Sequence, residues 1–155
     1  MEKVKSIEVL NRLIEINNDR IAGYETASEE TEESDLKNLF SRLKQTSLKC
    51  KSELTNEVVK LGGEPTEGTK TTGKFFRVWM DIKSTLTSKD RKAILNSCEF
   101  GEDIAVNIYQ KVLRDDLEDI NAEQQAMIDT QFTLIKADHD KVKELRDAMV
   151  DAYER

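Results

Sequence analysis

The chain has 155 residues with a formal net charge of −7, and 35% of the residues are charged while 6% are aromatic. This length is typical of one domain that can bury a core without help from a metal ion or a disulfide. Acidic and basic residues are interspersed, which argues against nucleic-acid binding, and no apolar run is long enough for a membrane span or a signal peptide. We therefore expect one cytoplasmic domain, residues 1–155, in which Cys50 and Cys98 are buried thiols rather than a disulfide.

Helical periodicity is clear in the first half of the chain. Inward-facing positions recur at alternating spacings of three and four from Ile7 to Ser28, which predicts a helix over residues 4–30. A second helix is predicted over residues 35–61, with Ser34 placed to cap its start. Gly62 and Gly63 suit a left-handed C-terminal cap, and Pro65 prevents the helix from continuing.

Residues 62–87 form a long connection in which we expect one additional short helix, at about residues 72–86. Large aromatic side chains gather on one side of this crossover helix, namely Phe75, Phe76 and Trp79. They are our candidate interaction surface, and the alternative is that they cover the core of the bundle itself. A third helix is predicted over residues 88–114, with Thr87 and Asp90 spaced as a capping box. A fourth is predicted over residues 122–152, where Asn121 and Gln124 have the same spacing.

The lengths of the links predict how the helices are connected. Short links between the first and second helices and between the third and fourth require antiparallel neighbours, whereas the long middle link can travel the length of the bundle. The predicted fold class is therefore all-α, as a ferritin-like antiparallel four-helix bundle with a long crossover between the second and third helices.

Polar residues interrupt the inward face near the middle of each predicted helix: Asn17, Ser47, Glu102 and His139. Burying such groups without partners costs about 1–3 kcal/mol each, so we expect them to bind one another, water or an ion. The simplest expectation is a hydrogen-bonded pair of Glu102 and His139 that fixes the helix register. Tyr24 and Tyr109 are expected in the core, each with its hydroxyl on a neighbouring side chain.

A metal site is the alternative at this height. Ferritin-like di-iron proteins use a Glu on each of two helices and a Glu-x-x-His pair on each of the other two. This chain has Lys136-x-x-His139 and Ser47-x-x-Cys50 at the corresponding positions and keeps Glu102, so it has too few ligands for two iron ions. A single iron or other transition-metal ion, bound by Glu102, His139 and Cys50, is the metal site that remains, and the leading expectation is no cofactor.

Several segments together resemble a known family. They are Leu61-Gly62-Gly63-Glu64-Pro65, Trp79-Met80-Asp81-Ile82-Lys83, Ala93-Ile94-Leu95, Cys98-Glu99-Phe100-Gly101-Glu102-Asp103-Ile104-Ala105 with Tyr109, and His139-Asp140. From about Ile7 to Arg146 the chain resembles domain of unknown function 2383, an uncharacterised bacterial family of ferritin-like four-helix bundles. Gly101-Glu102 is more distantly similar to a step in rubrerythrin, although Ala105 stands where that protein has a second Glu. The resemblance implies the fold and carries no established activity.

Three functions follow as hypotheses. The first is a non-enzymatic helical protein, with a role in stress as one option, that acts through assembly as a homo-oligomer or through a protein partner. The second is a metal-binding protein or metal-dependent oxidoreductase that uses a reduced ferritin-like site. The third is thiol sensing by Cys50 and Cys98. Both residues are expected on inward faces, which disfavours this function because the reactive thiolate is unfavourable there.

Overall fold

The computed structural model describes residues 3–68 and 90–154, and in these ranges it is an all-helical bundle. The long helices are α1 (Lys3–Glu30), α2 (Ser34–Lys60), α4 (Arg91–Asp115) and α5 (Ala122–Glu154), and the 3-10 helix η1 (Leu117–Asp119) lies between the last two. The predicted main helices agree with these bounds to within three residues. The predicted crossover helix, with Phe75, Phe76 and Trp79, lies outside the described residues. None of the described helices is long and apolar enough to cross a membrane.

Local sequence signals set most of the helix ends. Gly62 has a φ of +83°, and the amide groups of Gly62 and Gly63 donate to the carbonyls of Val59 and Val58, which completes the predicted glycine cap of α2. The Asn121–Gln124 capping box is confirmed, because each side chain accepts a hydrogen bond from the backbone amide of the other residue.

The other two N-terminal caps differ from the prediction. Glu33 is the N-cap of α2, without a side-chain hydrogen bond, and Ser34 is already helical. Asp90 is itself the N-cap of α4, and its side chain accepts from the amide of Ala93. Thr87, the predicted partner of Asp90, lies outside the described residues. Both predictions placed the start of the helix correctly to within a few residues but assigned the wrong capping side chain.

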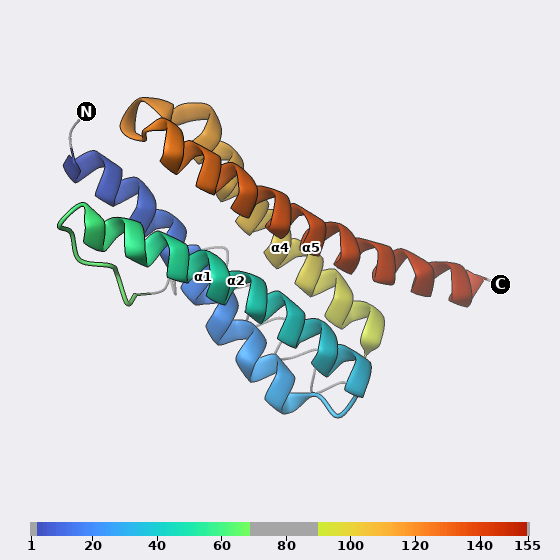
Figure 1. Ribbon diagram of the computed structural model, residues 1–155. Helices are drawn as coiled ribbons and strands as arrows, with labels where there is room; N and C mark the ends of the chain where they lie inside the picture. Colours follow the sequence, from blue (N-terminus) through green and yellow to red (C-terminus); the bar gives the residue numbers. More distant parts are fainter. Residues whose placement is uncertain (1–2, 69–89, 155) are drawn as a thin grey trace.

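The helices form two antiparallel hairpins, α1 with α2 and α4 with α5, that pack side by side (Figure 1). Contacts between the hairpins fix the chain directions. Near the N-terminus of α1, Arg12 forms an ion pair with Asp116 after α4, and at the opposite end Arg91 at the start of α4 pairs with Asp35 at the start of α2. Because α2 ends where α4 also ends, residues 61–90 connect opposite ends of the bundle. The order is therefore hairpin, crossover and hairpin.

Among the residues that the structure describes, the buried core consists of two apolar clusters, one toward each end of the bundle. The first cluster contains the following residues: Val9, Leu10, Leu13, Ile14, Ile16, Cys50, Leu54, Val58, Ala105, Val106, Tyr109, Val112, Ile120, Ile128 and Ile135. The second contains Tyr24, Ala27, Leu36, Leu39, Phe40, Leu43, Ile94, Leu95, Cys98 and Val142. Along every helix a buried polar residue lies between the members of the two clusters. This layer is the candidate functional site.

Candidate functional site

Each long helix contributes one side chain to a buried polar layer at mid-height, which we call the Arg20 layer: Arg20 from α1, Ser47 from α2, Glu102 from α4 and Asp138 from α5. The Arg20 guanidinium donates to both carboxylate oxygens of Glu102, with Nε–Oε2 and Nη2–Oε1 distances of 2.9 and 2.6 Å. It also donates to Ser47 Oγ at 2.6 Å and to Asp138 Oδ2 at 3.4 Å. The side chains of Arg20 and Glu102 have no solvent exposure. One guanidinium therefore connects all the helices.

Two further side chains complete this layer. The Tyr24 hydroxyl donates to Glu102 Oε2 at 3.0 Å, and the Arg20 guanidinium carbon lies 5.7 Å from the centre of the Tyr24 ring. At the edge of the bundle, the half-exposed Arg42 places Nε 3.5 Å from Asp138 Oδ1. The two buried carboxylates thus face two guanidinium groups, which balances their charge.

The buried charges of the layer shift the pKa values of its members. Burial alone would lower the pKa of Arg20, but the charge and the hydrogen bonds of Glu102 raise it above its ordinary value. Burial and the neighbouring Glu102 carboxylate likewise raise the pKa of Tyr24 above its ordinary value. Arg20 therefore stays charged and Tyr24 stays a neutral hydrogen-bond donor.

A second polar network lies one to two turns away from this layer. Asn17 Nδ2 donates to the Tyr109 hydroxyl at 2.9 Å, and that hydroxyl donates to Gln131 Oε1 at 2.7 Å. Gln131 Nε2 in turn reaches Glu53 Oε1 at 3.1 Å, near the surface. Both tyrosines therefore lie in the core with their hydroxyls on neighbouring side chains, which confirms the prediction for Tyr24 and Tyr109.

The structure distributes the predicted mid-height residues over different partners. Ser47 and Glu102 belong to the Arg20 layer, and Asn17 belongs to the second network. The predicted Glu102–His139 pair is wrong, because Glu102 binds Arg20 and Tyr24 while the hydrogen bonds of His139 go to Asp103 and Asp140. The inward position on α5 belongs to Asp138 instead.

The predicted ligand set of Glu102, His139 and Cys50 is not brought together as one group of ligand atoms within the described residues. Cys50 lies in the first apolar cluster, on the far side of the Arg20 layer from Cys98. Both carboxylate oxygens of Glu102 accept hydrogen bonds from the Arg20 guanidinium. Of the three residues, His139 alone lies in a group that could hold an ion.

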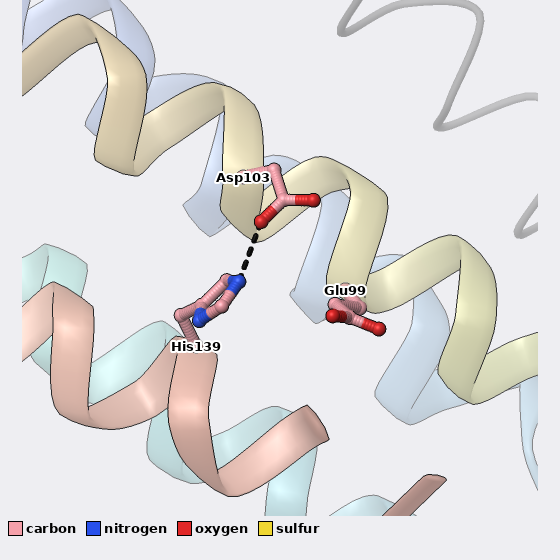
Figure 2. A group of neighbouring side chains, drawn as sticks. All are labelled: Glu99, Asp103 and His139. Carbon is pink, nitrogen blue, oxygen red and sulfur yellow. Dashed lines mark hydrogen bonds and ion pairs between the residues drawn. The ribbon is translucent and has the colours of Figure 1, made fainter. Parts of the chain in front are cut away.

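That group is a second, outward-facing cluster on α4 and α5. His139 points from α5 toward Asp103 and Glu99 on α4 (Figure 2). His139 Nε2 lies 2.5 Å from Asp103 Oδ1, and Nδ1 lies 3.0 Å from Asp140 Oδ1. One ligand atom from each of Glu99, Asp103 and His139 falls within 4.8 Å of the others. Side-chain exposure is 12% for His139 and 50% for Asp103, so the cluster opens to solvent on the Asp103 side.

The sequence matches the family model of domain of unknown function 2383 over residues 5–115. The chain belongs to this family. The matched range holds α1, α2 and α4, with Arg20, Ser47 and Glu102 of the Arg20 layer, whereas Asp138 and His139 of α5 lie outside it. No curated protein matches the chain.

In this member of the family both cysteines are free and buried, as predicted. Burial raises the pKa of Cys50 to about 11, and burial with the nearby Glu102 charge raises the pKa of Cys98 further. A thiol reacts through its thiolate, which is scarce under these conditions. The geometry therefore gives no support to thiol sensing.

Sequence reasoning missed Arg20, which is the centre of the site. Asn17, Arg20 and Tyr24 stand at spacings of three and four along α1, so all of them lie on the inward helical face. Arg20 is a basic residue between two inward positions, and the third helix has Glu102 on its inward face. These two facts together are the signal that could have predicted the Arg20–Glu102 pair. The Glu99–Asp103 spacing of four residues on α4 carried the corresponding signal for the outer cluster.

Proposed function

We propose that the chain is a non-enzymatic, ferritin-like bundle of the cytoplasm that acts through protein contacts. The order of hairpin, crossover and hairpin supports the ferritin-like assignment. One observation carries the non-enzymatic part: the Arg20 guanidinium lies where such bundles hold their metal ions, bound by Glu102 and close to Asp138. A tethered organic cation neutralises Glu102 there, and both carboxylate oxygens of Glu102 already accept hydrogen bonds from it.

The residues at mid-height do not fit a metal ion. An ion bound by Glu102 would have to expel the guanidinium from a fully buried position and leave Arg20 without its main counterion. Removing one partner of a buried pair costs about 3–5 kcal/mol. Cys50 offers no compensation, because it lies in the first apolar cluster and, within the described residues, is not grouped with Glu102 as a set of ligand atoms. A metal-dependent oxidoreductase at this site is therefore our second candidate function, after the non-enzymatic bundle.

The contact surface that we propose is a groove of about 270 Å³ between α2 and α5. Leucines form its apolar lining, namely Leu36, Leu39 and Leu145, and its basic residues are the exposed Arg42 and the partly buried Arg91 and Lys141. Asp35 is the acid in the lining, and it is paired with Arg91. Three basic residues against one acidic residue line the groove in a chain with a net charge of −7, and Arg42 and Arg91 also have ion-pair partners outside the lining, in Asp138 and Glu33.

The occupant that we propose is a second copy of the chain. The turn around η1, residues 115–119, carries four acidic residues and Leu117, whose exposure is 40%. This turn lies at the opposite end of the bundle from the start of α4, which lines the groove. An acidic turn with one exposed leucine matches the chemistry of a basic groove lined by leucines. Contact between opposite ends is heterologous, so copies would add head to tail.

Light scattering over a range of protein concentrations tests this assembly. We expect the mean molar mass to rise with concentration in a continuous manner, and to fall back toward one chain when the salt concentration is raised, because the contacts are partly ionic. The variants Lys141→Glu and Glu118→Lys should each remain monomeric, since each puts like charges in contact. Glu118 is exposed and Lys141 is partly exposed, so circular dichroism should show that both variants remain folded.

A mixture of the two variants provides the matched control. Lys141→Glu has an acidic groove with the acidic wild-type turn, and Glu118→Lys has a basic turn with the basic wild-type groove. Every contact between the two variants therefore joins opposite charges, and the mixture should add head to tail with the variants alternating although neither assembles alone. A wild-type chain that keeps the mass of one copy at every concentration would overturn the assembly.

A further inference from the structure

We propose that Glu99, Asp103 and His139 form a binding site for a divalent transition-metal ion, of the chemistry of Zn²⁺, on the outer surface between α4 and α5. The site is separate from the Arg20 layer and from the groove. It does not rest on the proposed assembly, and it keeps His139 from the ligand set predicted by sequence while Glu99 and Asp103 take the places of Glu102 and Cys50.

The first argument is the geometry of the donor atoms. An imidazole nitrogen and two carboxylate oxygens lie within 4.8 Å of one another, and they come from two helices that are packed against each other (Figure 2). Ligands bound at about 2.0–2.1 Å to a tetrahedral Zn²⁺ lie about 3.4 Å apart. His139 Nε2 and Asp103 Oδ1 now lie 2.5 Å apart, so they must separate by about 1 Å. The half-exposed Asp103 side chain has the room to make this change.

The second argument is the partner of the other imidazole nitrogen. His139 Nδ1 lies 3.0 Å from Asp140 Oδ1. Asp140 Oδ1 also accepts a hydrogen bond from Lys136 Nζ at 2.6 Å, so this carboxylate is held in place behind the imidazole, where it can accept from a protonated Nδ1. Metal-binding histidines generally have such a carboxylate behind them, because it orients the ring and makes the ligating nitrogen more basic. This arrangement aims Nε2 at Asp103 and Glu99.

The third argument is that a cation already lies on this site. Arg146 on α5 forms an ion pair with Glu99, and Arg146 also holds Asp147 through its Nη2. A metal ion would displace the guanidinium from Glu99, and Arg146 could keep its second partner. We infer that Arg146 competes with the metal ion for Glu99.

The donor set selects the class of metal ion. One imidazole with two carboxylates suits borderline ions such as Zn²⁺, and Mg²⁺ prefers oxygen donors alone in a strict octahedron. Two carboxylates match the charge of a divalent ion. Because Asp103 is half exposed, the solvent side leaves a coordination position for water.

Calorimetric titration of the untagged, full-length protein with Zn²⁺ tests the site. We expect one Zn²⁺ per chain and no saturable heat with Mg²⁺. His139→Gln and Asp103→Asn should weaken binding at least tenfold, and Asp140→Asn should weaken it by about 10- to 100-fold through the imidazole. Arg146→Gln should tighten binding because it removes the competing cation. Asp129→Asn, an exposed carboxylate elsewhere on α5, is the matched control and should leave the affinity unchanged.

The chain has a single histidine, so its imidazole nitrogen signals in NMR need no assignment. Zn²⁺ should shift the Nε2 signal and leave Nδ1 protonated, and circular dichroism should show that each variant remains folded. A wild-type chain without saturable binding, or a wild-type affinity in folded His139→Gln or Asp103→Asn, would overturn the site. An unchanged affinity in Arg146→Gln would overturn the competition by the guanidinium.

Discussion

Arg20 is fully buried and charged, which is costly unless the charge is compensated. Moving an ion out of water costs several kcal/mol, and the attraction of a partner repays it when the geometry is good and the remaining hydrogen bonds are made. Here the guanidinium binds Glu102 through two hydrogen bonds and also reaches Ser47. Such a pair adds little net stability compared with apolar packing. It does require each helix to sit at one height and one rotation, because any shift would leave a buried charge alone.

Breaking the Arg20–Glu102 pair from one side should be strongly destabilising. Arg20→Met leaves the buried carboxylates of Glu102 and Asp138 without the guanidinium, and we expect the free energy of unfolding to fall by about 3–5 kcal/mol. Urea unfolding followed by circular dichroism measures the loss. Lys49→Met is the control, since it breaks the exposed Lys49–Glu53 pair and should change the stability by less than about 1 kcal/mol.

The double variant Arg20→Met/Glu102→Met measures the coupling free energy between the two side chains. It removes both charges, so its loss should be clearly smaller than the sum of the two single losses. Asp138 keeps Arg42 as its partner. Strictly additive losses would contradict a coupled pair.

The raised pKa of the buried Cys50 thiol predicts that the folded protein loses stability at alkaline pH. Burial raises the pKa of this thiol from 9.0 to about 11, so the folded protein holds this proton while the unfolded chain releases it. The contribution is complete below pH 9 and is lost as the pH rises through 11, by about 3 kcal/mol in total. Urea unfolding at pH 8, 9, 10 and 11 should show this slope, and Cys50→Ala should show a shallower one. Equal slopes in the two proteins would contradict the assignment.

At the scale of the elements, the helix ends are set by short local signals. The end of α2 depends on Gly62, whose positive φ an L-residue adopts only with strain. The neighbouring Gly63 is needed for a different reason, because a Cβ there would lie 2.7 Å from Cδ1 of Ile7 on α1. The two glycines therefore stop α2 and allow the chain to pass close to α1.

Gly62→Ala should cost about 1–2 kcal/mol of stability through the backbone alone, because nothing lies within 4 Å of the added Cβ. Gly62→Asn should cost less, since Asn adopts the left-handed conformation more readily. Thermal and urea unfolding of both variants measure the difference. Equal stability of Gly62→Ala and the parent chain would show that strain does not determine this cap.

At the scale of the whole molecule, two hairpins share one interior. Each apolar cluster takes residues from both hairpins, and the Arg20 layer crosses from α1 and α2 to α4 and α5. Neither hairpin can bury its inward face alone. The ion pair adds to this dependence, because Arg20 and its carboxylate partners belong to different hairpins.

We expect the separated hairpins, residues 1–68 and 90–155, to be poorly helical alone and to recover helicity when mixed in equal amounts. Far-UV circular dichroism during titration of one fragment with the other measures the recovery. A first fragment that carries Arg20→Met should bind its partner at least tenfold more weakly, since it buries Glu102 without a counterion. Fully helical fragments that do not change on mixing would contradict a shared interior.

The four long helices, the hairpin connections and the buried polar residues at mid-height all follow from the order of the amino acids. Those features depend on periodicity and on local caps such as Gly62 and the Asn121–Gln124 box, which need no knowledge of distant residues. Tertiary packing alone decided the partners. Asp138 and His139 are adjacent on α5 and therefore point about 100° apart, so the rotation of the packed helix about its axis decides which one faces Arg20 and which one meets Asp103 at the surface.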